Sequence, residues 1–276
     1  MSISIYSNLA SVDAQMRLGT TQQAVQKNMS HLSSGLRIAD ASDDPAGLGI
    51  STLFDAQTRG YAQAARNAND GISMLQTAEG ALSQIQSALE RMRELAVQSS
   101  TGTYGATDRV NIVTEAQQLQ SEIDRIANST KFGNVQMLNA ATTVTLQVGI
   151  NNTAADQIQV NLAQSDSQTL GVDQASVKMD TQANAQAAIA KIDTALSNVS
   201  AQRANIGALE TRVGVANSND MAFEQNLSAA TSRIRDVDVA SESADLARNQ
   251  VLLQAGVAVL AQANQAPQIA LTLLQH

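Results

Sequence analysis

Few residues in this chain could carry out chemistry, and they do not combine into a catalytic set. Cysteine is absent from the 276 residues, which excludes thiolate nucleophiles, thiolate metal sites and disulfides. The two histidines, His31 and His276, are far apart in the sequence. His31 falls within a helical pattern, where we expect it on the polar side, and His276 is the last residue. We therefore predict no catalytic residue, no metal site and no cofactor.

Two pairs of aspartates have the spacing of an acid and a base, but each has a simpler structural explanation. Asp44 precedes Pro45, so it is placed to cap a helix whose first turn accommodates proline, with Asp43 as a neighbouring loop carboxylate. Asp236 and Asp238 lie beside two arginines, which indicates a solvated or ion-paired surface. Neither pair is accompanied by a nucleophile or a metal-ligand pattern, so an enzyme is the least favoured class.

The composition favours slender helices over a wide globular core. Hydrophobic residues make up 43% of the chain but aromatic residues only 2%. A net charge of -8 and a pI of about 4.7, with few aromatics for base stacking, argue against a nucleic-acid partner. The longest uncharged apolar stretch, residues 255–261, is too short to insert across a membrane. The N-terminus lacks the basic and apolar regions of a Sec-type signal.

Heptad patterns predict long helices that pack on one another. A first helical pattern runs from Leu18 to Leu36, and a loop over residues 39–44 separates it from a helix over residues 45–99. Gly60, Gly71 and Gly80 in that helix mark either close packing or bending. Steps of three and four residues form an unbroken apolar seam. It consists of Leu75, Ala78, Leu82, Ile85, Leu89, Met92 and Ala96.

In the middle of the chain the spacing of apolar residues changes twice, from helical to alternating and back. After a turn over residues 101–107, a second seam from Ile112 to Ile126 predicts a helix that returns antiparallel to the first. Alternation over residues 144–150 and 158–162, with turn formers between them, predicts a β-hairpin. The helical period resumes near residue 180. There we expect Arg203 to interrupt the seam and residues 214–220 to unwind or kink the helix.

The C-terminal segment is apolar and has no charged side chain. After Arg248 there is no Lys, Arg, Asp or Glu, yet apolar residues continue from Val251 to Leu274. A terminal segment of this kind indicates burial against another helix or another copy of the protein.

Several separate stretches together resemble the signatures of bacterial flagellin. The N-terminal stretches are residues 29–38, 43–48, 65–72, 76–82 and 93–98, and the C-terminal stretches are residues 232–236, 254–256 and 259–265 with Pro267 and the final Leu-Leu pair. Because many motifs occur in the expected order over nearly the whole chain, the resemblance is specific. One departure is residues 131–134 (KFGN), where the family usually has Phe-Asn-Gly.

The resemblance implies a mainly α fold: an elongated rod of coiled-coil-like helices from both chain halves, a small central hairpin, and terminal helices paired in a filament core. The large outer variable domains of longer flagellins are missing, because about forty residues separate the two rod halves. The implied regions are residues 1–42 and 239–276 for the inner tube, 43–141 and 180–238 for the two rod halves, and 142–179 for the hairpin region.

The implied function is a structural subunit that polymerises into the extracellular flagellar filament used for swimming. The terminal segments are expected to be largely disordered in a free subunit and ordered by neighbouring subunits. No Sec-type signal is expected, so export is expected through the flagellar type III route. The residues expected in the core between subunits are Leu18, Val25, Met29, Leu32, Leu252, Leu253, Val257, Leu260, Leu273 and Leu274.

The resemblance also implies partners beyond the homopolymer. These are filament cap and hook-junction proteins, a flagellar export chaperone at the C-terminal helix, and a host innate immune receptor; no nucleic acid and no membrane insertion are expected. Arg91, Leu95 and Glu115 match the receptor-contact pattern of recognised flagellins, and we expect Arg91 and Leu95 to lie outside the seam.

Two other classes remain open on the sequence alone. A hook-filament junction protein shares the terminal architecture but would be a minor component. A helical adaptor or secreted adhesin would stay monomeric and never form fibres.

Overall fold

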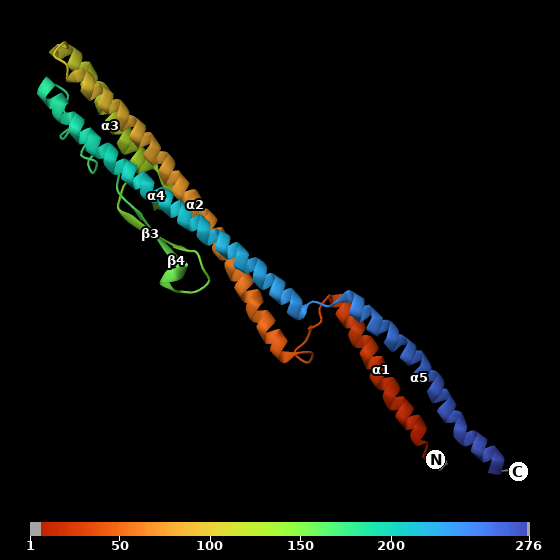
Figure 1. Cartoon of the computed structure of the whole chain (residues 1–276). Helices are drawn as coiled ribbons and strands as arrows, with labels where there is room; N and C mark the ends of the chain where they lie inside the picture. The colour runs from red at the N-terminus through yellow and green to blue at the C-terminus, as the bar shows by residue number, and fades with distance from the viewer. Residues whose placement is uncertain (1–6, 275–276) are drawn as a thin grey trace. The chain divides into compact units, whose positions relative to one another are not determined.

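The computed structural model describes the chain from residue 7 to residue 274, with side chains described for residues 7–265. Over this range the chain is mainly helical, with long helices from both halves of the sequence and a small central hairpin, as predicted (Figure 1). The helices are α1 (Leu9–Ser34), α2 (Pro45–Ser99), α3 (Ala106–Ser129), α4 (Gln182–Arg235) and α5 (Val239–Leu274). The short elements are β1 (Lys131–Phe132), β2 (Val135–Gln136), β3 (Thr142–Gln147), the 3-10 turn η1 (Ala154–Asp156) and β4 (Gln157–Leu162).

Internal contacts divide the chain into two compact units. Unit 1 comprises Met1–Ala56 and Asn226–His276, and unit 2 comprises Gln57–Gln225. The region boundaries expected from the sequence refer to an assembled filament and stay predictions.

The long helix α2 begins as its sequence predicts. The Asp44 carboxylate accepts hydrogen bonds from the backbone N–H groups of Ala46 and Gly47, at 3.1 and 3.0 Å, and Pro45 is the first helical residue. The helix then runs for 55 residues without a break, which at a rise of 1.5 Å per residue gives a length of about 82 Å.

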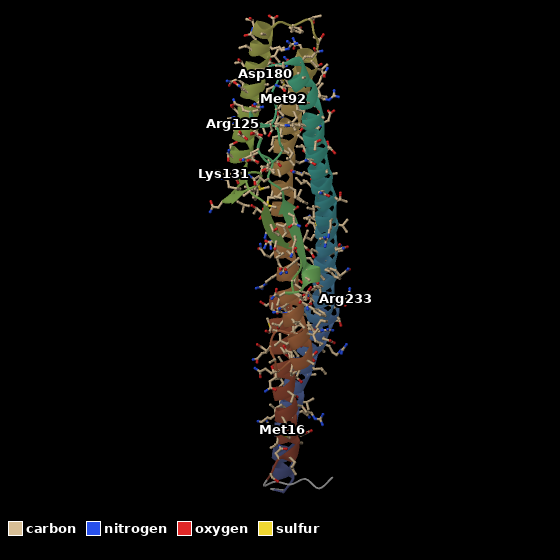
Figure 2. All side chains as sticks on the ribbon, turned by 90° about the vertical axis from the view of Figure 1, so that its left-hand side faces the viewer. Met16, Met92, Arg125, Lys131, Asp180 and Arg233 are labelled. Atoms are coloured by element: carbon tan, nitrogen blue, oxygen red, sulfur yellow. The ribbon has the colours of Figure 1, made fainter. Side chains whose placement is uncertain are left out.

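The core of unit 2 is the predicted seam of α2, packed against α3 and α4. All seven seam residues from Leu75 to Ala96 are fully buried. Figure 2 shows Met92 within this packing and Arg125 on the outer side of α3. The opposing side chains are short or branched, as expected for closely packed helices. They include Ile123 on α3 and Ala188, Ile192, Ala195 and Val199 on α4.

Polar contacts across the helices fix an antiparallel arrangement. Arg93 Nε donates to Asp193 Oδ1 at 2.6 Å, and Gln76 Nε2 donates to Glu210 Oε1 at 2.9 Å, so residue numbers rise along α2 while they fall along α4. Arg109 Nε near the start of α3 donates to the carbonyl of Ser99 at the end of α2, at 3.1 Å. The predicted return of α3 along α2 is therefore confirmed.

The central hairpin pairs β3 with β4 in antiparallel register and packs on α2. Val144 faces Val160, and Leu146 faces Ile158. Glycine makes room for the hairpin: a Cβ at Gly71 would lie 2.5 Å from Leu146 Cδ1, and one at Gly60 would lie 2.8 Å from Ile150 Cγ2. These two glycines are close-packing points and not sites of bending, whereas nothing lies within 4 Å of the Cβ position at Gly80.

A second, two-residue ladder lies where the sequence departs from the family pattern. β1 pairs with β2 through Lys131 opposite Gln136 and Phe132 opposite Val135. Gly133 between them has a φ of 57°, a left-handed conformation that favours glycine. The altered order of turn formers therefore still makes a tight turn.

The expectation of a break in α4 is wrong, because this helix is continuous over 54 residues. Polar side chains that could compete for the backbone hydrogen bonds of the helix bond to other groups or leave those bonds intact. Arg203 reaches a glutamate of α2, with Nε donating at 3.0 Å, and Asn217 Nδ2 donates to an asparagine of α2 at 3.1 Å. Ser218 Oγ donates to the carbonyl four residues before it, which leaves the helical hydrogen bonds intact.

One seam position of α4 holds a buried carboxylate. Val199, Ile206, Val213 and Asp220 recur at seven-residue steps, and Asp220 is only 5% exposed. Its Oδ2 atom has no hydrogen-bond partner among the described residues. Burial, and to a lesser extent the Asp156 carboxylate of η1, raises the pKa of Asp220 to about 6.

A charge in the α2 seam should destabilise the fold. Leu89 is fully buried, so Leu89→Asp places an unpaired carboxylate in the core, and we expect the free energy of unfolding to fall by about 3 to 5 kcal/mol. Val97→Asp, at a position 48% exposed on the same helix, is the matched control and should change it by less than about 1 kcal/mol. Urea unfolding followed by circular dichroism measures both; equal midpoints would contradict the seam.

Removing the Asp220 charge should stabilise the chain near neutral pH. Because the folded-state pKa of about 6 exceeds the ordinary 3.8, stability falls as pH rises from about 4 through 6, and the loss is complete above 6. We expect Asp220→Asn to raise the free energy of unfolding at pH 7 by about 1 to 3 kcal/mol, and the gain to shrink at pH 4. Asp70→Asn, at an exposed position of α2, is the control. A gain independent of pH would contradict this assignment.

Candidate functional site: the paired terminal helices

The two terminal helices, α1 and α5, lie side by side and antiparallel within unit 1 (Figure 1). At one end of the pair, Asn8 Nδ2 donates to the carbonyl of Ala263 at 2.8 Å, and Ser11 Oγ donates to Asn264 Oδ1 at 2.7 Å. At the other end His31 lies against α5. The predicted pairing of the N- and C-terminal helices is therefore confirmed within a single chain.

A seam of small and polar residues joins the two helices. The inward positions of both helices follow alternating steps of three and four residues, the spacing of a coiled coil. A Cβ at Gly256 would lie 3.1 Å from Leu18 Cδ1, so the glycine lets the helices approach closely. On α1 the buried and half-buried seam positions are Ser11, Ala14, Leu18, Thr21, Val25, Asn28 and Leu32. On α5 the half-buried seam positions are Leu246, Asn249, Leu253, Gly256, Leu260 and Ala263.

The outer faces of the same helices carry large apolar side chains among polar ones. In a pair of helices, each helix covers only one side of the other. After Arg248, α5 has no charged residue on its uncovered side that would be solvated by water. Large apolar side chains therefore project from both helices, as Figure 2 shows for Met16. The exposed fractions lie between 51% and 74% for Leu9, Val12, Met16, Met29, Val239, Val251, Leu252, Val257 and Val259.

The ten residues expected in the core between subunits divide between these two faces. Five of them lie half-buried in the seam within the chain: Leu18, Val25, Leu32, Leu253 and Leu260. Met29, Leu252 and Val257 are 57%, 51% and 54% exposed on the outer faces. Leu273 and Leu274 lie outside the residues whose side chains are described.

A short crossing of two chain segments holds the pair to the rest of unit 1. Gly35 ends α1 in the left-handed conformation, with a φ of 73° and its N–H donating to the His31 carbonyl. Leu36 then pairs with Asp236, and the Arg37 N–H donates to the Arg235 carbonyl at 2.7 Å.

Charged side chains complete both helix ends at this crossing. The Arg37 guanidinium donates to the carbonyl of Ile234 at 2.6 Å, at the end of α4 where a cation is favoured. Asp238 caps α5, because its Oδ1 accepts from the N–H groups of Ala240 and Ser241. Asp236 and Asp238 are both exposed, in agreement with the expected solvated surface, and Asp238 has a capping role in addition. Arg235 pairs with Asp55 at 3.1 Å.

His31 is not on the polar side of α1, which corrects the expectation for this residue. It is 7% exposed, because α5 and the loop after α1 cover it. Asp43 is the loop carboxylate expected, and Asp44 is the expected cap of α2. The contact of His31 with two carboxylates was missed because the partners, Asp43 and Glu242, are 12 and 211 positions away in the sequence.

The three residues of the receptor-contact pattern do not share one environment. Arg91 on α2 and Glu115 on α3 are exposed and form an ion pair at 2.8 Å. Leu95 is only 1% exposed, so the expectation that its side chain lies outside the seam is wrong. The seam of α2 is wider than one row, and Leu95 extends it toward the neighbouring helices.

Among the described residues, no group of three His, Cys, Asp or Glu side chains is placed to hold a metal ion. No helix in the described part of the chain is long and apolar enough to cross a membrane.

Comparison with known proteins identifies relatives over nearly the whole length. Residues 5–143 match the bacterial flagellin N-terminal helical region, and residues 189–274 match the bacterial flagellin C-terminal helical region. The chain is 45% identical to a flagellin of Halalkalibacterium halodurans over 272 residues, covering 98% of this chain and 99% of that protein. It is 40% identical to a flagellin of Bacillus subtilis over 306 residues, with the same shares covered.

Solved structures give the same result. The crystal structure of Bacillus cereus flagellin is similar with a TM-score of 0.50 and 29% identity, covering 56% of this chain and 88% of that one. Because the relative from Halalkalibacterium halodurans aligns over 99% of its own length, the short middle of this chain is shared with it.

Proposed function

We propose how this chain, which belongs to the bacterial flagellin family, assembles: its copies bury the outer faces of α1 and α5 against the same helices of neighbouring copies. The chain is a structural subunit of the extracellular flagellar filament and not an enzyme. The observation that carries this proposal is the row of large apolar side chains that α1 and α5 leave more than half exposed. Self-polymerisation is a property of the family. What we propose here is which face of which helices performs it.

Burial of these side chains supplies a large part of the driving force for association. Covering the exposed half of one Val, Leu or Met side chain contributes on the order of 1 kcal/mol. Nine such side chains project from α1 and α5, so several of them together offset a large part of the entropy lost on association. The exposed residues occur along both helices, from Leu9 to Met29 and from Val239 to Val259, which supports contacts with more than one neighbour.

A contact between different faces can repeat without closing. When one copy uses one side of its helix pair and the next copy uses another side, the interface is heterologous, and it propagates as an open helix of subunits when the rotation does not close a ring. Side chains that are apolar on several sides of α5 suit such a contact. A twofold dimer would need only one self-complementary patch.

The seam between α1 and α5 bears on the state of the free subunit. Half of its positions are small or polar, so the pair itself buries little apolar area. This supports the prediction that the terminal segments are disordered in a free subunit and become fixed when neighbours cover the outer faces. Hydrogen exchange of the free chain would test this prediction directly.

We propose that the remaining partners use the same helices. An export chaperone would cover the apolar outer face of α5 before assembly, on the flagellar type III route, where a chain without cysteine can travel unfolded. Filament cap and hook-junction proteins would contact the helix pair at the two ends of the polymer. The exposed apolar side chains of α5, Val251 and Leu252 among them, support a binding site for such partners.

An innate immune receptor, if it binds this chain, would contact the exposed pair of Arg91 and Glu115. Both side chains are about half exposed, and they already neutralise each other, with Glu94 as a second partner of Arg91 at 2.8 Å. A receptor group would therefore have to compete with these ion pairs. Leu95 is not included in this proposal because it is buried.

A charge on the outer face of α5 should block assembly without unfolding the subunit. Leu252 is 51% exposed, so we expect Leu252→Asp to change the free energy of unfolding by less than about 1 kcal/mol, yet to stop elongation from filament seeds. Val110→Asp, at a position 61% exposed on α3, is the matched control and should elongate normally. Light scattering and electron microscopy after seeding measure both. Normal filaments from Leu252→Asp would contradict the proposed surface.

Removal of the chain from Asn249 onward should leave a folded but assembly-incompetent subunit. The deletion takes away most of the α5 seam and its outer face, while every element of unit 2 is retained. We expect the truncated chain to keep a cooperative thermal transition by circular dichroism and to form no fibres after seeding. Filaments of normal appearance would show that the C-terminal half of α5 is not required.

A further inference from the structure

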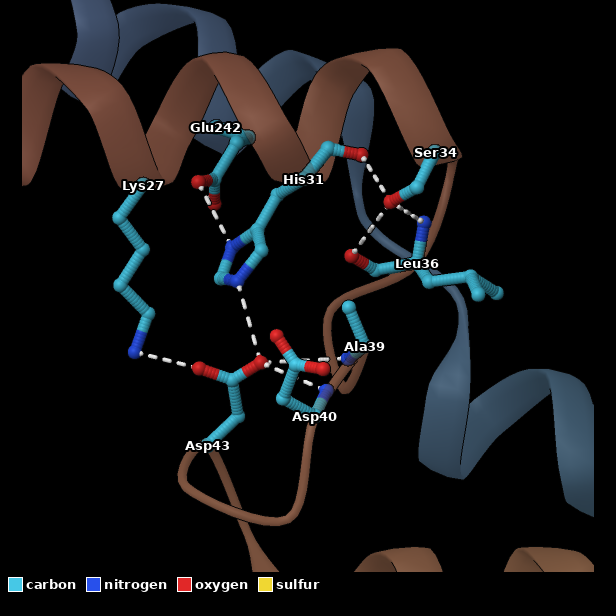
Figure 3. Close-up of polar contacts among 8 residues, drawn as sticks. All are labelled: Lys27, His31, Ser34, Leu36, Ala39, Asp40, Asp43 and Glu242. Atoms are coloured by element: carbon cyan, nitrogen blue, oxygen red, sulfur yellow. Dashed lines mark hydrogen bonds and ion pairs between the residues drawn. The ribbon is translucent and has the colours of Figure 1, made fainter.

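One buried side chain connects three segments of unit 1. His31, in the last turn of α1, directs its two ring nitrogens at carboxylates on two other segments (Figure 3). Its Nδ1 lies 3.1 Å from Glu242 Oε1 on the first turn of α5. Its Nε2 lies 3.7 Å from Asp43 Oδ2 in the loop that precedes α2. We refer to His31, Asp43 and Glu242 as the histidine clamp.

The ring makes one hydrogen bond, with Glu242 at 3.1 Å, and one longer contact, with Asp43 at 3.7 Å. An ionised carboxylate accepts hydrogen bonds and donates none, whereas a neutral imidazole carries only one N–H. A neutral His31 therefore satisfies one carboxylate and presents a lone pair to the other. The imidazolium form carries both N–H groups, and the C-terminal end of α1, where the helix carbonyls gather, also favours a cation.

The neighbouring groups hold the Asp43 carboxylate in its charged form. Lys27, one turn before His31 on α1, places Nζ 2.8 Å from Asp43 Oδ1. The backbone N–H groups of Ala39 and Asp40 donate to Asp43 Oδ2 at 3.2 and 3.3 Å. The hydrogen bond from Lys27 is the main reason, followed by these N–H groups, why the pKa of Asp43 is lowered to about 2. Lys27 is the one cation that contacts a clamp carboxylate among the described residues.

We infer that His31 is a positioning residue for assembly: it ties the end of α1 to the start of α5 and to the loop before α2, and so fixes the register in which the two outer faces are presented to a neighbour. This inference rests on the proposed function of those faces. Among the described side chains, the far end of the pair is joined by neutral hydrogen bonds of Asn8 and Ser11, which are weaker than contacts between charged groups. The clamp is therefore the strongest polar restraint that the described side chains place on the register of α1 against α5.

The clamp can be tested in assembled filaments, where we expect the terminal helices to be ordered. We would compare the His31 ring nitrogen resonances of wild type and Glu242→Gln by solid-state NMR at one fixed pH. The Nδ1 resonance should move in Glu242→Gln, because a neutral amide replaces the carboxylate 3.1 Å away. Identical His31 resonances in the wild type and this variant would overturn the clamp.

The positioning role can then be tested by seeded elongation at one fixed pH. His31→Ala should elongate at least about tenfold more slowly than wild type, the factor that loss of one hydrogen bond to a charged group corresponds to. His31→Arg keeps donors for the two carboxylates, so it should restore most of the rate. Arg125→Ala, which breaks an exposed ion pair within α3, is the matched control.

The outcomes separate this inference from the proposed function. His31→Ala elongating like wild type, with Leu252→Asp still blocked, would overturn the positioning role and leave the assembly surface standing. Normal elongation of Leu252→Asp would instead overturn the assembly surface, and the positioning role with it. Circular dichroism of each variant excludes global unfolding as the cause of a slow rate.

Discussion

Two helices lying side by side can shield only one side of each other, and the function of this subunit depends on that limit. α1 and α5 meet through a seam of serine, threonine, asparagine, glycine and alanine among a few larger residues. Their large apolar side chains are consequently left on the outside, Leu252 and Val257 among them. In unit 2 the opposite holds, because α2 is covered by α3, α4 and the hairpin and its seam from Leu75 to Ala96 is fully buried. One chain thus contains a self-sufficient core and a pair of helices whose outer faces remain uncovered.

Polar contacts in this protein set register more than they add stability. Arg93 with Asp193 and Gln76 with Glu210 fix how α2 and α4 slide against each other, and the exposed positions of these pairs limit their energetic value. At the end of α1 the ring of His31 is buried, so its contacts with Asp43 and Glu242 are screened less. A buried charge without such contacts is destabilising: the Asp220 carboxylate occupies a seam position, and its Oδ2 atom has no hydrogen-bond partner among the described residues.

Elements whose seams are made of large apolar residues could be predicted from the sequence. The spacing of large apolar residues such as Leu82, Leu89 and Ile123 places them all on one face of each helix. This spacing predicts α2, α3 and their antiparallel packing. The hairpin follows from alternation on both sides of a turn. The seam between α1 and α5 could not be found in this way, because small or polar residues, Ser11, Thr21 and Asn28 among them, occupy about half of its positions and an apolar pattern does not include the polar ones. Leu18 and Leu252 therefore looked equivalent, although one faces the partner helix and the other faces outward. The environments of His31 and Leu95 depend on segments that only the tertiary fold brings together.

The hairpin packs closely on α2 at Gly60 and Gly71, while its connecting residues Asn151–Ala155 are exposed. These contacts with α2 come from Leu146 in β3 and from Ile150, three residues after that strand. Additional length at this point would leave the packed helices as they are. The connection should therefore accept inserted peptides, epitopes or whole domains. Related subunits could differ in sequence and length at this point while the helices that associate stay the same.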